Sequence, residues 1–279
     1  MIGLGSNRLT LARRGGMSVT QAGRGGMEWL AGFRAPSWAS PYSAQATAAL
    51  KAQFPTQWPT IRDYGFAHPA LVPFINEDPM LVCSLIPELN SERWLQSDGN
   101  CWIDAGRTIN LNDIVRFKAY RTLPETSGEK GYFGVRDNGY ISYFLATQYY
   151  GGNTILDFYY NNNGGGSSTF TNDNSTNPIN VELKEGKFYL NGTLKVTRSL
   201  LADKQSNINY LIFAVAMQGE VSRKLATKIA YLEHNSKSDD PIAKFVPCKS
   251  GGVVGMLDVV GVEFHPKQGS GTMTIIDPS

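Results

Sequence analysis

The sequence from Lys187 to Val196, KFYLNGTLKV, has the pattern of a β-hairpin. Two short runs rich in strand-forming residues flank Asn191-Gly192, a dipeptide that favours the left-handed backbone of a type I′ turn. A turn of two residues joins antiparallel strands, because the chain reverses its direction within the turn. The segment therefore predicts antiparallel β-structure in this part of the chain.

Similar short patterns extend from the hairpin in both directions. Residues 141–145 alternate between Ile, Tyr or Leu and the residues Ser142 and Phe144, as in a strand with one buried face. Further strands are expected at residues 155–160, 207–217, 228–233, 243–246 and 253–258. No helical pattern stands out after residue 91, so the sequence predicts an antiparallel sandwich or barrel there.

Charge and glycine are concentrated at the N-terminus. Residues 1–62 carry seven basic groups and one acidic group, a net charge of +6, and eight of the first 34 residues are glycine. This split indicates a charged arm, residues 1–40, attached to a separately folded body. Guanidinium groups spaced among glycines can pair with carboxylates or phosphates of a partner. A nucleic acid and the chain's own body are the alternative surfaces. The predicted anchoring residues are Arg8, Arg13, Arg14, Arg24, Arg34 and Trp29.

Residues 41–90 are expected to form a short helix followed by a collar or linker. Ser40 is a candidate N-cap and Pro41 suits a first helical turn, which predicts a helix over residues 40–54. Eight of the 14 prolines lie from Pro36 to Pro87, which favours an extended connector after Pro55. Its bulky aromatic residues indicate that it packs on a surface rather than hanging free.

Several classes of segment are not expected. The first 34 residues lack the apolar run of a secretory signal, and the later apolar run from Tyr210 to Met217 is too short to cross a bilayer. The three cysteines, Cys83, Cys101 and Cys248, lack metal-binding spacing and are expected to be buried free thiols.

Seven segments in a fixed order resemble one family of domains. WLQSDGNCWIDAG, from Trp94 to Gly106, resembles the opening of the concanavalin A/laminin-G-like jelly rolls found in tailed-phage virion structural proteins. The others are GYFGVR at 131–136, FYLNG at 188–192, IAYLE at 229–233, KFVPCK at 244–249, VVGMLDVV at 253–260 and FHPKQGSG at 264–271. The resemblance covers about residues 91–275 and implies a concanavalin A-like jelly roll over residues 91–279. The arm also resembles the openings of virion proteins of phages of gut anaerobes, such as head fibre proteins of the crAss-like group.

The resemblance implies a non-enzymatic bacteriophage structural protein. The arm would anchor it to a capsid or tail lattice, and the jelly roll would be displayed outward as a head fibre or decoration. Such appendages are symmetric homo-oligomers, with a trimer favoured, and they are assembled in the host cytoplasm and located in the virion. Neither membrane insertion nor sequence-specific nucleic-acid binding is expected.

No catalytic motif is present. Glycosidases of this fold carry acids at alternate positions of one strand, ExDxE or ExDxxE, and the chain has neither. It also lacks GxSxG, P-loop and HExxH motifs. We therefore expect no enzymatic activity, cofactor or metal. Asp98, Asp104 and Asp258 are interpreted as turn and strand-end residues, with calcium ligation as the alternative.

Aromatic and amide residues at 147–180 form a candidate glycan-binding site. Aromatic rings stack on sugar C–H groups, and amides bond to hydroxyls. The candidate residues are Tyr149, Tyr150, Tyr160, Asn161 and Asn162, with host polysaccharide as the candidate ligand. The alternative interpretation is a strand core followed by a long loop. This site also supports a second function, a tail-associated or bacterial-surface carbohydrate-binding adhesin.

Overall fold

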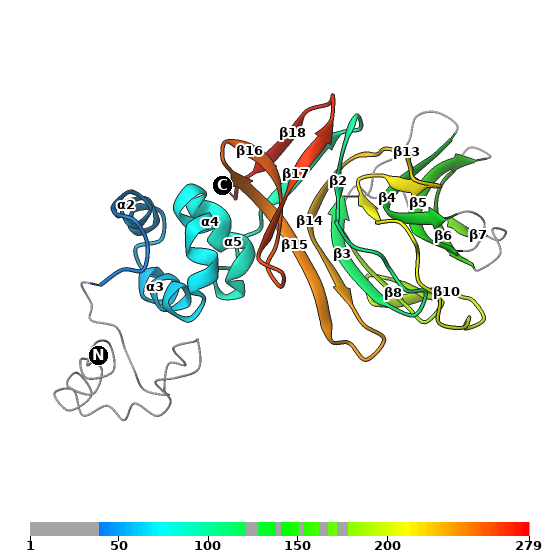
Figure 1. Cartoon of the computed structure of the whole chain (residues 1–279), viewed down its shortest axis with the longest axis horizontal. Coiled ribbons are helices and arrows are strands. Elements are labelled where there is room, and N and C mark those ends of the chain that lie inside the picture. Colours follow the sequence, from blue (N-terminus) through cyan, green and yellow to red (C-terminus); the bar gives the residue numbers. More distant parts are fainter. Residues whose placement is uncertain are drawn as a thin grey trace, which may run out of the picture.

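The structure is a computed structural model of the chain, and it describes residues 39–120, 128–137, 141–150, 153–161, 167–171 and 178–278. Helices occupy one end of an elongated molecule, and β-strands form the rest (Figure 1). The predicted arm lies outside the described residues, apart from its last two positions.

Residues 39–90, which we term the helical base, contain several short helices. The α-helices are α2 (Ala44–Gln53), α3 (Trp58–Ala67), α4 (Val72–Glu77) and α5 (Val82–Leu85), and the 3₁₀ helices are η1 (Pro69–Leu71), η2 (Pro79–Leu81) and η3 (Pro87–Leu89). The prediction of a single helix followed by an extended connector is therefore wrong. Five prolines of this segment stand at the starts of helices, where a missing N–H costs nothing, rather than in extended chain: Pro59, Pro69, Pro73, Pro79 and Pro87.

The first helix also begins later than predicted. Ser43, not Ser40, is the N-cap, since its hydroxyl accepts a hydrogen bond of 3.2 Å from the backbone N–H of Ala46. The Ser40 hydroxyl instead lies 2.7 Å from that of Thr47 and accepts from the N–H of Tyr42. Ser40 therefore fastens the chain entering the helix.

The strands follow in chain order from residue 94. They are β1 (Trp94–Asp98), β2 (Cys101–Asp104), β3 (Ile114–Tyr120), β4 (Gly128–Asp137), β5 (Ile141–Tyr150), β6 (Asn153–Asn161), β7 (Ser167–Thr171), β8 (Pro178–Lys184), β9 (Lys187–Leu190), β10 (Thr193–Thr197), β11 (Leu211–Ile212), β12 (Val215–Met217), β13 (Glu220–Ser222), β14 (Ala226–Asn235), β15 (Pro241–Ser250), β16 (Val253–Asp258), β17 (Glu263–Gly269) and β18 (Met273–Ile276).

These strands form two layers in which every pairing is antiparallel except that of β12 with β4. Sheet A runs β10–β9–β8–β3–β14, and the other edge of β14 is shared by β1, which pairs with β18, and by β15, which continues to β16 and β17. Sheet B runs β17–β2–β11–β4–β5–β6–β7. Strand β17 belongs to both sheets, so the layers are continuous at that corner. This arrangement is an antiparallel jelly-roll sandwich, as predicted, and several short helices precede it.

The hairpin at residues 187–197 is confirmed. Leu190 pairs with Thr193 across the turn, and Asn191 and Gly192 have φ angles of 49° and 76°. The expected strand over residues 207–217 is instead broken. Phe213 has a φ of 67° and separates β11, antiparallel to β4, from β12, parallel to β4.

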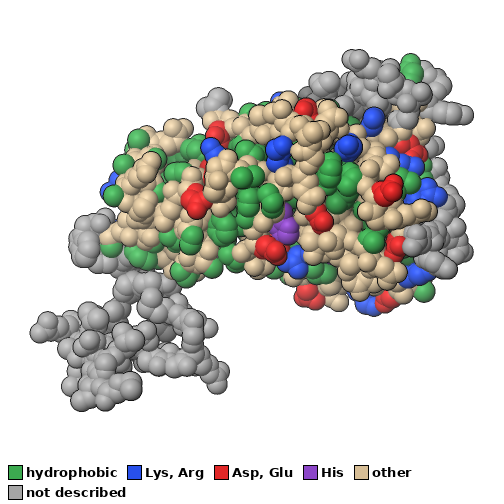
Figure 2. Space-filling model, turned by 45° about the horizontal axis from the view of Figure 1, so that its top comes forward, with side chains coloured by type: hydrophobic (Ala, Val, Ile, Leu, Met, Phe, Trp, Pro, Cys, Tyr) green, Lys and Arg blue, Asp and Glu red, His purple; other side chains and the backbone are tan. Residues whose placement is uncertain are grey.

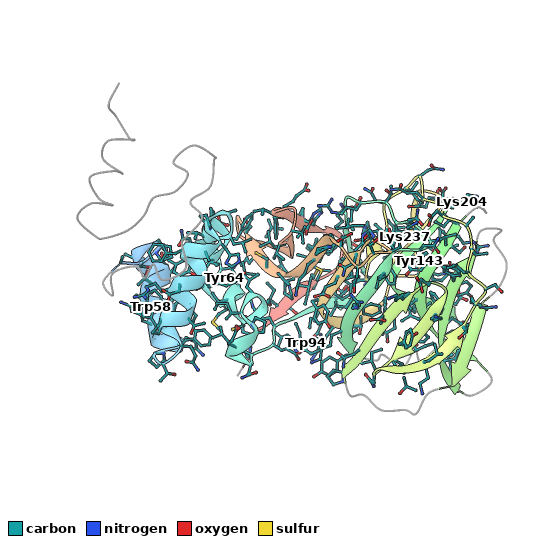
Figure 3. All side chains as sticks on the ribbon, turned by 90° about the horizontal axis from the view of Figure 1, so that it is seen from below. Trp58, Tyr64, Trp94, Tyr143, Lys204 and Lys237 are labelled. Atoms are coloured by element: carbon teal, nitrogen blue, oxygen red, sulfur yellow. The ribbon has the colours of Figure 1, made fainter. Side chains whose placement is uncertain are left out.

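The main core lies between the two sheets and is rich in aromatic residues. Ile141, Tyr143 and Leu145 of β5 face this core, as their alternation predicts. The buried Tyr143 hydroxyl donates to the backbone oxygen of Asp113 at 2.8 Å. A second core joins the helical base to sheet A, because Leu50, Ile61 and Ile75 cluster with residues of β15 and β16. Figure 3 shows Trp58 and Tyr64 in the base and Tyr143 inside the sandwich.

Candidate functional site

The predicted glycan-binding residues do not come together. In the pairing of β5 with β6, Tyr150 is opposite Asn153, whereas Asn161 is opposite Ser142. At about 3.4 Å per residue, the two ends of this strand pair lie roughly 25 Å apart. The side chains of Tyr150 and Asn161 lie outside the described residues, as does Asn162. Tyr149 is exposed at 40%, so one ring remains accessible.

Tyr160 is part of the core rather than of a ligand surface. Only 4% of it is exposed, and its ring lies 6.1 Å from Tyr143 and 5.9 Å from Phe158, centroid to centroid. Its hydroxyl donates to Asn112 Oδ1 at 2.9 Å and accepts from the N–H of Leu201 at 3.2 Å. The prediction for Tyr160 is therefore wrong, because the alternation of β6 turns this side chain inward.

The predicted anchoring residues cannot be placed. Arg8, Arg13, Arg14, Arg24, Trp29 and Arg34 all lie outside the described residues. Their role stays a prediction.

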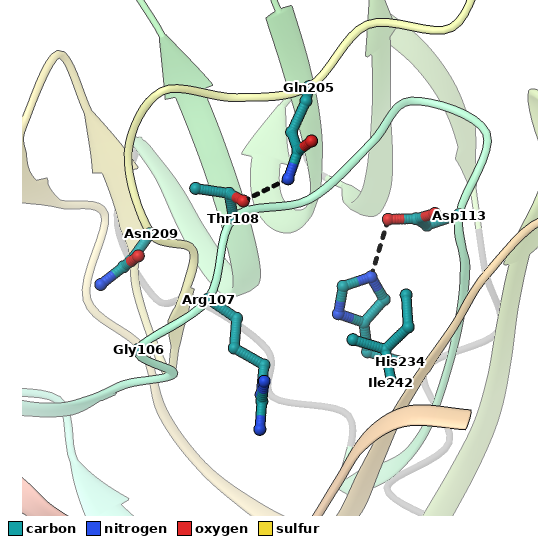
Figure 4. A pocket seen from close by; sticks show the side chains of 8 residues that line it. All are labelled: Gly106, Arg107, Thr108, Asp113, Gln205, Asn209, His234 and Ile242. Carbon is teal, nitrogen blue, oxygen red and sulfur yellow. Dashed lines mark hydrogen bonds and ion pairs between the residues drawn. The ribbon is translucent and has the colours of Figure 1, made fainter. Parts of the chain in front are cut away.

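A polar depression of about 390 Å³ opens on the sandwich (Figure 4). It is formed where the segments that follow β2 and precede β11 meet the β14–β15 hairpin. The lining residues are Gly106, Arg107, Thr108, Asp113, Gln205, Asn209, His234 and Ile242. These residues lie far apart in the sequence, and each segment lacks a recognisable motif. Sequence reasoning therefore missed this site.

A histidine–aspartate pair forms one wall of the depression. His234 Nε2 lies 2.8 Å from Asp113 Oδ2, and His234 is only 1% exposed. The Tyr210 hydroxyl lies 3.4 Å from His234 Nδ1. Burial raises the pKa of Tyr210 well above its ordinary value, so this hydroxyl stays protonated. The imidazole is thus held between two partners in one orientation.

Arg107 forms the other side of the depression. Its Nη2 donates to Asp258 Oδ2 at 2.5 Å, and its buried Nε has no hydrogen-bond partner within the described part of the chain. The Asp258 carboxylate also accepts backbone N–H bonds from Lys244 and Val260, each at 3.0 Å. The Arg107 guanidinium is therefore held at the rim by Asp258, whose carboxylate is oriented by backbone N–H groups of Lys244 and Val260.

The lining of the depression can bind a polar ligand. It offers guanidinium, amide and carboxylate groups, which bond to hydroxyl or carboxylate groups of a ligand. The Thr108 hydroxyl accepts a hydrogen bond of 2.5 Å from Gln205 Nε2.

The three aspartates that were alternative calcium ligands are turn and strand-end residues, as predicted. Asp98 accepts backbone N–H bonds from Asn100 at 2.8 Å and Thr272 at 2.7 Å, and these bonds lower its pKa. Asp104 accepts from the N–H of Gly106 at 2.8 Å. Within the described ranges, no group of three or more His, Cys, Asp or Glu side chains could hold a metal ion.

The geometry thus defines a β-sandwich protein with a helical base and a polar depression. No family model matches the chain, and no curated protein matches it. Among solved structures, the native heptameric SAP-like pentraxin from Limulus polyphemus is similar, with 11% sequence identity and a TM-score of 0.41 over 67% of this chain and 94% of that chain. At this identity the likeness concerns the fold alone. No helix of the described residues is long and apolar enough to span a membrane.

Proposed function

We propose that this chain is a non-enzymatic structural protein of a bacteriophage virion, anchored by its N-terminal arm and displaying the sandwich outward. The observation that carries the proposal is the position of the helical base. It follows the predicted arm in the sequence, it occupies one end of the described part of the molecule, and the described C-terminal residues lie close to it (Figure 1). The sandwich can therefore project away from an attachment point at the base.

The helical base is joined to the sandwich by hydrogen bonds as well as by apolar packing. Glu77 Oε2 accepts hydrogen bonds from the Ser250 hydroxyl at 2.9 Å and from the Gly251 N–H at 2.7 Å. The Lys249 N–H donates to Asp78 Oδ2 at 2.9 Å. Together with the shared apolar core, these bonds transmit the orientation of the base to the displayed domain.

The surface of the base also suits attachment. Its 52 residues include six charged side chains, of which Arg62 and Asp78 are buried. On the face shown in Figure 2, apolar side chains gather over the base, whereas most acidic and basic side chains lie over the sandwich. A surface with few charges loses little hydration when it is covered by a lattice.

Incorporation into particles tests the proposal. In the full chain, Arg8, Arg13, Arg14, Arg24 and Arg34 are replaced together by Gln, and Trp29→Ala is made separately. The matched control replaces the exposed Lys195, Lys237 and Lys249 of the sandwich by Gln. We expect both arm variants to be lost from gradient-purified particles while the control is retained. Normal incorporation of the arginine variant would contradict the anchoring role.

A carbohydrate-binding adhesin is the second candidate function. The amide and guanidinium groups around the depression, and the exposed ring of Tyr149, support it. Glycan arrays probed with the full chain test this candidate. Reproducible binding that is lost in Arg107→Ala and Asn209→Ala would place the ligand in the depression, and loss only in Tyr149→Ala would place it on β5. Arrays without any binding would leave display as the sole function.

A further inference from the structure

The outer face of sheet B carries a closed cluster of aromatic and charged residues. Phe144 of β5 and Tyr159 of β6 stack with ring centroids 4.1 Å apart and an interplanar angle of 15°. They point away from the main core, yet Phe144 is completely buried, as are the neighbouring Ala146 and Val215. A segment of the chain therefore covers this face.

Arg223, which directly follows β13 (Glu220–Ser222), forms part of that cover. Strand β13 pairs with β12, and we term residues 218–224 the lid. The Arg223 guanidinium lies 5.0 Å from the Phe144 ring centroid and 5.6 Å from that of Tyr159. It also forms an ion pair with Glu129 of β4, whose other carboxylate oxygen accepts from the Tyr159 hydroxyl. The Gly131 N–H donates to the Arg223 backbone oxygen at 2.6 Å.

Arg223 holds an unfavourable backbone conformation. Its φ of 50° lies in the left-handed region that residues with a Cβ seldom adopt, whereas the φ of 53° at Gln218 belongs to the two-residue turn between β12 and β13. Such residues persist only where their surroundings hold them. Releasing the contacts of Arg223 would therefore let the lid relax.

Asp157 of β6 lies on the same outer face of sheet B, and its buried carboxyl lacks a full set of hydrogen-bond partners. It is 1% exposed, and its Oδ1 has no hydrogen-bond partner among the described residues. The charged groups that act on it are Glu129 of β4 and Arg223 of the lid, and its neighbour across the strands on β5 is Ala146. One guanidinium thus faces two carboxylates.

We propose that the lid over the outer face of sheet B opens and closes with the protonation of Asp157. With Asp157 neutral, Arg223 and Glu129 balance each other and the lid is closed. With Asp157 ionised, one negative charge is left uncompensated in a buried place, and opening the lid to water relieves it.

The direction of the response follows from the two protonation equilibria. Burial, with a further contribution from Glu129, raises the pKa of Asp157 to about 7 in the closed state, against an ordinary value of 3.8 for a hydrated carboxyl. The ratio of open to closed lid therefore increases with pH between these two values, by at most about tenfold per pH unit, and levels off above pH 7. The lid is closed in acid and loosened at neutral pH.

Hydrogen–deuterium exchange of the lid amides tests this proposal. Protection factors for residues 218–224, corrected for the intrinsic pH dependence of exchange, are measured on the full chain at several pH values from 5 to 8.5. We expect protection to fall severalfold or more between pH 5 and 7 and to stay level above about pH 7.5. Amides of β3 and β14, in the other sheet, serve as the internal reference. A lid whose protection relative to that reference does not change with pH would overturn the proposal.

Three variants separate the role of Asp157 from other titrations. Asp157→Asn stays neutral, so its lid should remain closed at all these pH values, whereas Asp63→Asn, an exposed change on α3, should respond like the wild type. In Glu129→Gln the response should keep its sign but become smaller, because burial still raises the pKa of Asp157 while the contribution of Glu129 is removed. An Asp157→Asn protein that keeps the wild-type response, or a Glu129→Gln protein whose response is as large as that of the wild type, would refute the mechanism.

Discussion

The Arg93 guanidinium binds the carboxylate of Asp78 through two parallel hydrogen bonds, Nη1 to Oδ2 at 2.9 Å and Nη2 to Oδ1 at 3.0 Å. Arg93 immediately precedes β1, and Asp78 lies between α4 and η2. The same guanidinium donates to Asp277 Oδ1 at 2.6 Å and to the Pro247 carbonyl at 3.3 Å. One buried side chain thus ties the helical base, β15 and the C-terminal segment together.

Loss of this ion pair should be costly. Arg93→Met leaves Asp78 buried without its counter-ion, and we expect the free energy of unfolding to fall by about 3–5 kcal/mol. Urea denaturation followed by tryptophan fluorescence measures it. The matched control is Arg116→Met, whose partners Glu182 and Asp239 are partly exposed, and it should cost less than about 1 kcal/mol. Equal losses in the two variants would contradict the assignment of Arg93 as the central tie.

Two glycines with positive φ should respond differently to alanine. At Gly134, with a φ of 134°, a Cβ would lie 2.1 Å from the Phe144 Cβ and 2.4 Å from the Tyr143 backbone oxygen. Gly134→Ala should therefore prevent folding or lower the melting temperature severely. At Gly192, in the hairpin turn, a Cβ would meet nothing within 4 Å, so Gly192→Ala should cost only about 1 kcal/mol of backbone strain. Thermal denaturation followed by circular dichroism compares the melting temperatures of the two variants. A Gly134→Ala protein as stable as Gly192→Ala would show that β4 and β5 can separate locally.

The two tyrosines predicted to bind glycans should differ in their effect on stability. Tyr160→Ala removes a core ring and leaves Asn112 Oδ1 without its donor, so we expect a loss of about 3–5 kcal/mol. Tyr149→Ala changes an exposed side chain and should stay within about 0.5 kcal/mol of the wild type. Chemical denaturation of both variants measures these losses. A stable Tyr160→Ala protein would mean that the ring does not support the core.

The pH dependence of stability should carry the signature of Asp157. Between its ordinary pKa of 3.8 and its raised folded-state pKa of about 7, the folded chain holds a proton that the unfolded chain has released. The contribution of Asp157 to the free energy of unfolding therefore falls as pH rises through that window, by at most about 1.4 kcal/mol per pH unit. Above the window it stays constant. Asp157→Asn should lack this component and should exceed the wild type most at pH 8. Urea denaturation at pH 5, 6, 7 and 8 gives the difference curve, and a flat difference would be inconsistent with a raised pKa.

The cysteine thiols should be inert in the folded protein. All three are buried and free, as predicted from their spacing. Burial is the main cause that raises the pKa of Cys83 to about 11 and that of Cys248 to about 12. At pH 8 we expect a colourimetric disulfide reagent to react roughly a hundredfold more slowly with the native chain than with the chain in urea. Rapid reaction of one thiol in the native state would reveal local opening around it.

The strand pattern was predictable because period-two alternation and turn chemistry act over a few residues. The inward face of β5, the turn at Asn191-Gly192 and the position of β16 follow from such local signals. The helical base was misinterpreted for the opposite reason. Its helices are of ten residues or fewer, too short to be stable by propensity, and they persist through packing on β15 and β16.

The candidate sites depend on contacts between distant segments. Asp113 meets His234 across 121 residues of sequence, and Arg107 meets Asp258 across 151. Glu129 and Asp157 lie on strands separated by β5, and the lid that covers them comes from residues 218–224. None of these pairs has a spacing that a sequence pattern can detect.

Local chemistry in the sequence was thus sufficient for the antiparallel strands, the hairpin and the burial of the cysteines. Only the tertiary structure showed that the proline-rich segment is a helical base, that Tyr160 belongs to the core and that one guanidinium faces two carboxylates under the lid. The physical reason is the distance in sequence over which each feature is determined. Backbone angles and side-chain alternation are set by neighbours in sequence, whereas burial and charge balance are set by residues brought together from the whole chain.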